Sequence, residues 1–208
     1  MSLMSENATS RALAVALWPD NVNQFVQGAV LVLLGTVVLA ISAKIRVPFY
    51  PVPMTLQTFA VMAIAAAYGS RLAVLTVLAY LFEGALGLPV FTGTPPAVAG
   101  PLYFLGPTGG FLIGFILLAL IVGTATDRGW DRSIPRLFAA MVVADVVVFA
   151  LGFGWLAWFA QLSSGAQGIG AQAAFMGGVV PFILADLLKI ALAALAIPAA
   201  WGLLERRG

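Results

Sequence analysis

The sequence predicts an all-α integral membrane protein, a bundle of six transmembrane helices with a ligand site near its outer side. Composition is the first observation behind this prediction: 62% of the residues are hydrophobic, 9% are charged, and the mean hydropathy is +1.06. Soluble domains carry about 25% charged residues. The second observation is that several apolar runs, spread along the chain, approach or exceed the ~20 residues that cross a bilayer. The third is a small set of charges inside those runs, which predicts where a ligand binds.

The first 24 residues are expected to form a cytoplasmic or interfacial lead-in. They begin "MSLMSENATSRALAVALWPDN" and lack the basic start and uninterrupted apolar core of a cleaved signal peptide. Residues 25–208 are expected to form one six-helix transmembrane substrate-binding domain.

Gly, Pro and charged residues divide the apolar runs into six candidate helices. These are expected at Phe25–Ala43, Met54–Gly69, Arg71–Leu88, Gly109–Thr126, Pro135–Gln161 and Gly178–Leu204. Only Gly69, Ser70 and Arg71 are available as a turn between the second helix and the third, and a connection this short is acceptable between antiparallel neighbours.

The basic residues set the expected orientation. With a cytoplasmic N-terminus, seven of the ten Lys and Arg residues lie inside, Lys44 and Arg46 lie outside, and Lys189 lies within a span. The inner seven are Arg11, Arg71, Arg128, Arg132, Arg136, Arg206 and Arg207. Because cytoplasmic loops carry the excess of Lys and Arg, both termini are expected in the cytoplasm, with the protein in the cell (inner) membrane.

The residue types that are missing exclude several function classes. The chain has no Cys and no His, which removes disulfides, thiol nucleophiles, imidazole bases and the usual zinc sites. The "GPTGG" at residues 106–110 lacks the Lys of a phosphate-binding loop, and no G-x-x-x-x-G-K-[ST] motif occurs. A net charge of +2 is too small to indicate a nucleic-acid partner. We therefore expect neither an enzyme nor a metal site.

An acid and a base stand three positions apart in the apolar segment "PFILADLLK" (181–189). Asp186 and Lys189 share one helix face. Helical rise places both in the outer half of the membrane or near its centre, with Gln57 and Glu83 in the same outer layer. A charge at the bilayer centre costs at least ~2.5 kcal/mol, so these groups are expected to face protein or a cavity. A ligand site is the first interpretation, and a structural ion pair is the alternative.

Two further polar side chains leave their roles open. Tyr80 lies one turn before Glu83 and could hydrogen-bond to its carboxyl group, so both are candidate ligand contacts. Asp145 lies deeper and has no basic residue nearby in sequence. It is either protonated and hydrogen-bonded to another helix, or functional.

The two outer loops are expected to enclose the site. "KIRVPFYPVPMTLQTF", which starts at Lys44, contains three prolines and is therefore stiff and extended. Its apolar side chains are expected to cover the outer mouth of a cavity as a lid, and an ordinary interfacial connection is the alternative. These lid residues are Phe49, Tyr50, Val52 and Met54. The Gly- and Pro-rich stretch 87–115 is expected to form part of the site wall, because irregular backbone at membrane depth is tolerated only in such places.

Four segments together carry a family resemblance. They are "PVPMTLQTFAV" (51–61), "GALGLPVF" (84–91), "LGPTGGFLIGF" (105–115) and "PFILADLLK" (181–189). In this order they resemble the BioY family, the biotin-specific substrate-binding S components of energy-coupling-factor (ECF) transporters. The resemblance implies six helices and biotin bound near the outer side beneath the first loop. It also implies a transmembrane coupling (T) subunit and ATP-binding cassette ATPase subunits as partners that use the ATP, with no cofactor in this chain.

The resemblance also implies roles for individual residues. Asp186 and Lys189 would be polar ligands of biotin, and Thr55 and Gln57 lie in the matching first-loop motif. By their chemistry, we expect Asp186 to accept a ureido N–H and Lys189 to donate to the ureido carbonyl or the valerate carboxylate. The loop after "GLPVF" reads "TGTPPAVAGPLYF", without the basic residue expected in some relatives. The candidate partners of the ligand carboxylate are therefore Lys189, Lys44 and Arg46.

The function expected from these observations is biotin capture for uptake, without catalytic chemistry. An ion-coupled secondary transporter of a small carboxylate-containing vitamin is the main alternative, with Glu83, Asp145 or Asp186 as its proton site. An intramembrane aspartyl hydrolase with Asp145 and Asp186 as a dyad ranks last. Lys189 would hold Asp186 ionised, whereas such a dyad shares a proton.

Overall fold

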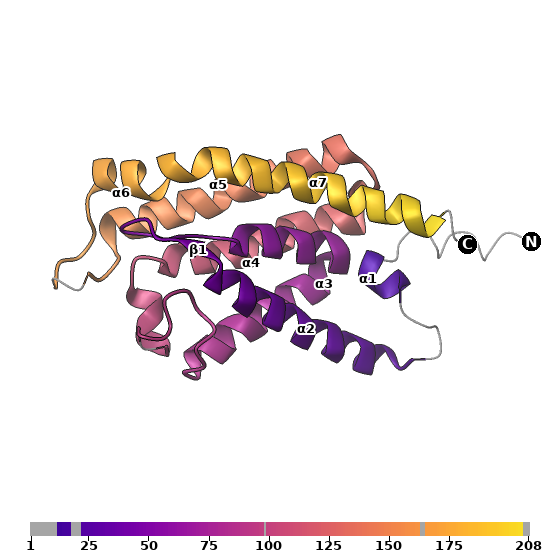
Figure 1. Cartoon of the computed structure of the whole chain (residues 1–208), viewed down its shortest axis with the longest axis horizontal. Coiled ribbons are helices and arrows are strands. Elements are labelled where there is room, and N and C mark those ends of the chain that lie inside the picture. Colours follow the sequence, from indigo (N-terminus) through magenta and orange to yellow (C-terminus); the bar gives the residue numbers. More distant parts are fainter. Residues whose placement is uncertain (1–11, 18–21, 98, 163–164, 206–208) are drawn as a thin grey trace, which may run out of the picture.

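The computed structural model describes residues 12–17, 22–97, 99–162 and 165–205, and its helices run along one long axis (Figure 1). Five described segments are long and apolar enough to cross a membrane. They are α2 (Gln24–Lys44), α3 (Gln57–Ala85), α4 (Gly109–Asp127), α5 (Ile134–Trp158), and the segment Ala171–Leu204 that holds α6 (Ala171–Gly178), η3 (Val180–Phe182) and most of α7 (Ile183–Glu205). The shorter elements are α1 (Leu13–Ala16), β1 (Arg46–Val47), β2 (Met54–Thr55), η1 (Pro101–Leu105) and η2 (Trp130–Arg132). The prediction of a helical membrane protein is confirmed.

Helix α3 covers the region where the sequence predicts two helices. Its backbone at Gly69 has φ 75° and ψ 176°, which is not helical. Gln57 Nε2 donates a hydrogen bond of 2.9 Å to the Tyr80 hydroxyl. An unbroken helix would hold these two residues about 34 Å apart, so the two halves of α3 fold back on each other at Gly69. The chain therefore reverses where the sequence predicts it, inside α3.

The end of α4 holds this reversal in place. The Asp127 carboxylate accepts the Ser70 N–H at 3.3 Å on each oxygen, and it also accepts the Ser70 hydroxyl. Gly123 allows α4 to approach the turn closely, because a Cβ at Gly123 would lie 2.5 Å from Ser70 Cα. Small residues at such contacts let membrane helices pack backbone against backbone.

Local sequence signals explain where the other elements begin and end. The Asn23 side chain accepts the Phe25 N–H at 2.8 Å and caps α2. Strands β1 and β2 form an antiparallel ribbon, with Arg46 opposite Thr55 and Val47 opposite Met54. The three prolines predicted to stiffen this loop lie between the two strands. Pro135 occupies the first turn of α5, where its missing N–H costs nothing.

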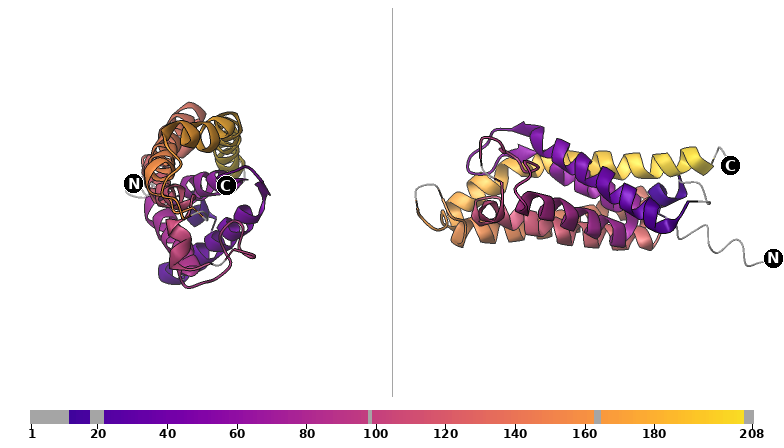
Figure 2. Two further views of the ribbon diagram at one scale, coloured as in Figure 1. Left: turned by 90° about the vertical axis from the view of Figure 1, so that its left-hand side faces the viewer. Right: turned by 90° about the horizontal axis from the view of Figure 1, so that it is seen from below.

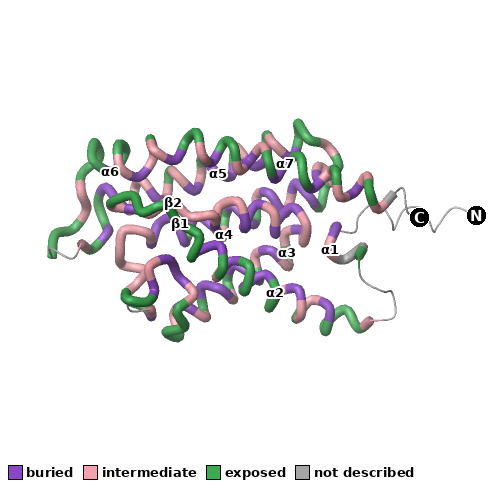
Figure 3. Tube along the Cα trace, in the orientation of Figure 1, coloured by how far each residue is buried: buried purple, intermediate pink, exposed green. Residues whose placement is uncertain are grey.

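The buried positions face the interior of the bundle, and the exposed positions lie on its outer surface (Figure 3). Large exposed hydrophobic side chains follow α2 and α7 along their lengths. On these two helices they include Leu33, Leu34, Val37, Val38, Ile41, Leu184, Leu188, Leu192 and Leu195. A soluble protein rarely exposes apolar surface of this extent, so these faces fit a lipid environment.

The two ends of the bundle differ in their basic residues. Helix α1 and the end of α7 lie at one end, whereas the β1–β2 ribbon and α6 lie at the other (Figures 1 and 2). The turn of α3 and η2 share the first end, where Trp201 Nε1 of α7 donates to Asp131 Oδ2 at 2.5 Å. Of the basic residues that the structure describes, Arg71, Arg128, Arg132 and Arg136 belong to this end. Lys44 and Arg46 belong to the ribbon end.

The predicted lead-in, residues 1–24, is only partly within the described ranges. Residues 1–11 and 18–21 lie outside them. Within the described part, α1 packs against α3 and buries the side chain of Leu13.

Candidate functional site

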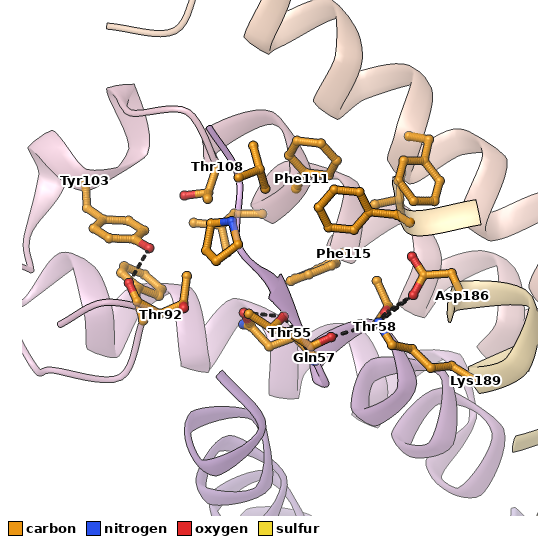
Figure 4. Close-up of a pocket in the computed structure, with 17 residues that line it drawn as sticks. Thr55, Gln57, Thr58, Thr92, Tyr103, Thr108, Phe111, Phe115, Asp186 and Lys189 are labelled. Carbon is orange, nitrogen blue, oxygen red and sulfur yellow. Dashed lines mark hydrogen bonds and ion pairs between the residues drawn. The ribbon is translucent and has the colours of Figure 1, made fainter. Parts of the chain in front are cut away.

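A pocket lies between the ribbon, the loop before α4, and helices α3, α4, α5 and α7 (Figure 4). Its walls are formed by Val52, Pro53, Thr55, Gln57, Thr58, Phe91, Thr92, Tyr103, Thr108, Phe111, Leu112, Phe115, Val148, Phe149, Phe182, Asp186 and Lys189. Polar side chains gather at two ends, and aromatic rings lie between them.

Asp186 and Lys189 form the first polar end. The two side chains form an ion pair of 2.5 Å between Lys189 Nζ and Asp186 Oδ1, and Asp186 is only 1% exposed. Lys189 Nζ also donates to the Thr55 carbonyl at 2.7 Å and to Thr58 Oγ1 at 3.0 Å. An ammonium has three N–H donors, so Lys189 is fully engaged. Thr58 Oγ1 in turn donates to Asp186 Oδ1 at 3.0 Å.

The second oxygen of Asp186 is different, because Asp186 Oδ2 is buried and has no hydrogen-bond partner among the described residues. An unsatisfied buried acceptor costs about 1–3 kcal/mol, and more when it is charged. Asp186 lies in the first turn of α7, where the helix dipole favours a negative charge. A ligand N–H donor that enters the pocket would satisfy this oxygen.

The second polar end is formed by Thr92, Tyr103 and Thr108. The Tyr103 hydroxyl donates to the Thr92 carbonyl at 2.8 Å. Thr92 Oγ1 is buried without a partner among the described residues, as Asp186 Oδ2 is at the other end. Burial raises the pKa of Tyr103, and the Thr108 side chain and, to a smaller degree, the positive charge of Arg46 partly oppose that rise. Tyr103 therefore stays protonated and able to donate at neutral pH.

Aromatic rings fill the space between the two polar ends. Phe149 packs against Phe182 with ring centroids 6.1 Å apart, and against Phe111 at 6.2 Å. Phe91 stacks on Tyr103 at 4.6 Å. Pockets that hold small molecules share this plan of mostly apolar walls and a few placed polar groups.

The predicted site residues fall into two groups. Thr55, Gln57, Asp186 and Lys189 line the pocket. Tyr80 lies behind the wall, where its hydroxyl accepts from Gln57 and donates to the Val90 carbonyl at 3.1 Å.

Glu83 does not line the pocket. Among the described residues, Tyr80 and Glu83 form no hydrogen bond with each other, so this prediction was wrong. The reason is that the fully buried Tyr80 turns inward to Gln57 and Val90, whereas Glu83 lies on a half-buried face of α3.

The four predicted lid residues also differ in their positions. Val52 is buried and lines the pocket beside Pro53. Met54 packs against the core, and Phe49 contacts Phe182 with ring centroids 6.3 Å apart. Tyr50 points away, with 86% of its surface exposed.

The sequence reasoning did not single out four polar residues that line the pocket. These are Thr58, Thr92, Tyr103 and Thr108. Thr58 directly follows Gln57 in the first-loop motif, and its hydroxyl lies 3.0 Å from Asp186 Oδ1. The other three lie in the stretch 87–115, for which only a general wall role was predicted.

Asp145 of α5 lies outside the pocket lining. Its Oδ1 is buried and has no hydrogen-bond partner among the described residues. Within those same ranges, no group of three or more acidic, His or Cys residues could hold a metal ion.

Lys44 fixes the loop that carries Phe91 and Thr92. Its ammonium donates to the carbonyls of Pro89 at 2.6 Å, Phe91 at 2.7 Å and Thr94, and it approaches Thr94 Oγ1 at 3.3 Å. The three N–H donors thus tie the end of α2 to a loop that has few backbone hydrogen bonds of its own.

Lys44→Met is expected to loosen this loop. The variant keeps the length of the side chain but leaves three carbonyls without their donor. Amide hydrogen exchange between residues 88 and 97, measured by mass spectrometry, should accelerate about tenfold. Arg71→Met at the opposite end is the matched control and should leave these rates unchanged. Unchanged rates in Lys44→Met would show that the loop holds its shape without the ammonium.

Comparison with known proteins was made for both sequence and structure. A model of the BioY family matches residues 9–206. The probable biotin transporter BioY of Pyrococcus horikoshii is 37% identical over 163 residues, which cover 78% of this chain and 89% of the relative. The biotin transporter BioY of Thermotoga maritima is 34% identical over 160 residues, covering 77% and 87%.

A solved structure supports the same fold. The crystal structure of the S-component for biotin from an ECF-type ABC transporter matches with a TM-score of 0.71 and 23% sequence identity. The match covers 92% of this chain and 96% of that one. A match of this quality over nearly the whole of both chains shows that the two proteins share a fold.

Proposed function

Because this chain belongs to the BioY family, we propose that it captures biotin as the membrane-embedded S component of an ECF transporter. The observation that carries the proposal is the buried, unpartnered Asp186 Oδ2 beside an aromatic pocket. Biotin has a ureido ring with two N–H donors and one carbonyl, an apolar thioether ring, and a five-carbon acid chain. Its donors, its apolar body and its acid match one polar end, the aromatic middle and the second polar end.

In this arrangement a ureido N–H donates to Asp186 Oδ2. Lys189 reaches the ureido carbonyl by giving up Thr58 Oγ1, the most distant of its three acceptors. Thr58 retains its own bond to Asp186 Oδ1, so the exchange leaves the carboxylate supported. Gln57 and Thr55 contribute the wall beside this end, and Tyr80 holds Gln57 from behind. Glu83 lies outside the lining, so it makes no contact with biotin in this arrangement.

The proposal includes six crossings and an outward-facing pocket. Each half of α3, 57–68 and 70–85, accounts for one crossing, which adds a sixth to the five long segments. The protein then lies in the cell membrane with its Arg-rich end, both termini and the lead-in 1–24 on the cytoplasmic side. Residues 25–208 form the substrate-binding domain. Val52, with the loop from Phe49 to Met54, covers the outer mouth. A T subunit and ATP-binding cassette ATPase subunits supply the energy.

A calorimetric titration of the purified full-length protein tests this function. Biotin is expected to bind, and lipoate is the matched control because it has the same five-carbon acid chain but no ureido group. A site built to hydrogen-bond a ligand group rejects an analogue without it strongly, so lipoate should bind at least ~100-fold more weakly. Equal affinities, or no binding of biotin, would contradict the proposal.

The unpartnered Asp145 Oδ1 favours the second candidate, an ion-coupled transporter with Asp145 as its proton site. The two functions predict different results. Biotin binding by an S component needs no proton gradient. If vesicles that contain only this chain took up biotin, lost uptake on addition of a protonophore, and lost it again in Asp145→Asn, the second function would hold.

A further inference from the structure

A bound carboxylate needs a partner at the second polar end of the pocket. This step rests on the proposed function, in which the ureido ring occupies the Asp186 end. The acid chain then extends past the aromatic rings toward Thr92, Tyr103 and Thr108 (Figure 4). The lining contains a single cation, Lys189, and it lies at the opposite end.

Position and existing hydrogen bonds remove two of the three candidate cations. Lys189 lies at the ureido end, where its three N–H donors are used on Asp186, on Thr55, and on Thr58 or the ureido carbonyl. Lys44 directs its donors to three carbonyls of the loop 89–94. The Arg46 guanidinium, by contrast, has neither a hydrogen bond nor an ion pair to any residue that the structure describes.

Arg46 pairs across the ribbon with Thr55, which lines the pocket, and directly opposed residues project from the same face of a ribbon. Arg46 therefore lies at the edge of the pocket. Two observations place its guanidinium toward the second polar end. A Cβ at Gly93 would lie 3.3 Å from Arg46 Nη1, so the guanidinium lies next to Gly93, the residue that follows Thr92. Its charge also acts on Tyr103.

We infer that Arg46 is the specificity residue that pairs with the carboxylate of the bound ligand, aided by the unpartnered Thr92 Oγ1. The planar guanidinium matches a carboxylate with two parallel hydrogen bonds, which a lysine cannot reproduce. Arg46 is exposed and lies outside the pocket lining, at its edge, where it can turn toward the acid of an occupied site. Without a ligand its charge stays in solvent.

Titration with biotin and with biotinamide, its neutral primary amide, tests the pairing. The wild-type protein should bind biotin about tenfold more tightly than biotinamide, as expected for a charge-assisted hydrogen bond. Arg46→Gln should weaken biotin binding about tenfold and leave biotinamide binding within twofold. Arg46→Lys should give an intermediate affinity for biotin, because it keeps the charge without the fork. Arg71→Gln, at the other end of the bundle, should change neither affinity.

Each contrary result has a separate meaning. If the wild type bound both ligands equally, or if Arg46→Gln weakened both equally or neither, the pairing would be overturned while biotin capture stood. If the wild type bound no biotin, the proposed function itself would fail. The comparison of the two ligands on the wild type needs no variant, so it decides the question even if Arg46→Gln does not fold.

Discussion

Asp186→Asn is expected to reduce biotin affinity about a hundredfold. The Asn side chain presents either an amide N–H or a neutral oxygen to the ureido N–H. The N–H cannot accept its hydrogen bond, and the neutral oxygen accepts it more weakly than a carboxylate does. The variant also removes the negative charge beside Lys189. Loss of a buried charged hydrogen bond costs about 3 kcal/mol, which corresponds to roughly a hundredfold in affinity. Calorimetric titration of both proteins measures the difference. Lys189 keeps Thr55 and Thr58 as acceptors, so the variant is expected to fold.

Asp145→Asn is the matched control for this change. It makes the same substitution at another buried carboxylate, on the neighbouring α5, outside the pocket lining. Its affinity for biotin is expected to stay within threefold of the wild type. If Asp186→Asn bound biotin as tightly as the wild type does, Asp186 would be a structural ion-pair partner and not a ligand.

Gly69→Ala is expected to destabilise the protein at the reversal of α3. The φ of 75° with ψ of 176° is open essentially only to glycine, and another residue there costs about 1–3 kcal/mol. The added Cβ would also lie 2.4 Å from Asp127 Oδ1, the group that holds Ser70. Thermal unfolding in detergent should therefore show a midpoint lowered by several degrees, in line with a loss of about 2–4 kcal/mol.

Gly202→Ala provides the comparison. Gly202 lies inside α7, and a Cβ there would meet no atom within 4 Å. Alanine is the better helix former by about 1 kcal/mol, so this variant should be as stable as the wild type or more stable. Equal midpoints for the two alanine variants would mean that α3 reverses without a glycine conformation.

Composition and the spacing of charges were sufficient to predict much of this protein. Apolar runs predicted the long helices to within a few residues, because in lipid only a helix satisfies the backbone along such a run. The three residues at 69–71 predicted the reversal. The pair Asp186 and Lys189 was predicted as a polar site from its spacing and depth, since isolated charges are costly there.

Other features depended on contacts between segments far apart in the sequence. Nothing in the sequence near Tyr80 shows that it turns to Gln57 and Val90 and not to Glu83. Thr58 is a helix residue and Thr92 a loop residue, and nothing in the sequence marks either as part of a site. Their roles follow only from the packing of α7 beside Thr58 and of η1 beside Thr92. The same is true of Lys44 and Arg46, which are two residues apart. Lys44 donates to three loop carbonyls, whereas Arg46 has no partner among the described residues.

The sequence by itself thus determined that the chain lies in a membrane as a helical bundle, where it reverses, and that Asp186 and Lys189 lie within the bundle as a polar site. Only the tertiary structure decided which donors and acceptors of those charges are already satisfied. Burial is set by hydropathy, which the chain carries residue by residue. Hydrogen-bond satisfaction is set by distances of about 3 Å between segments, and these exist only after the helices pack.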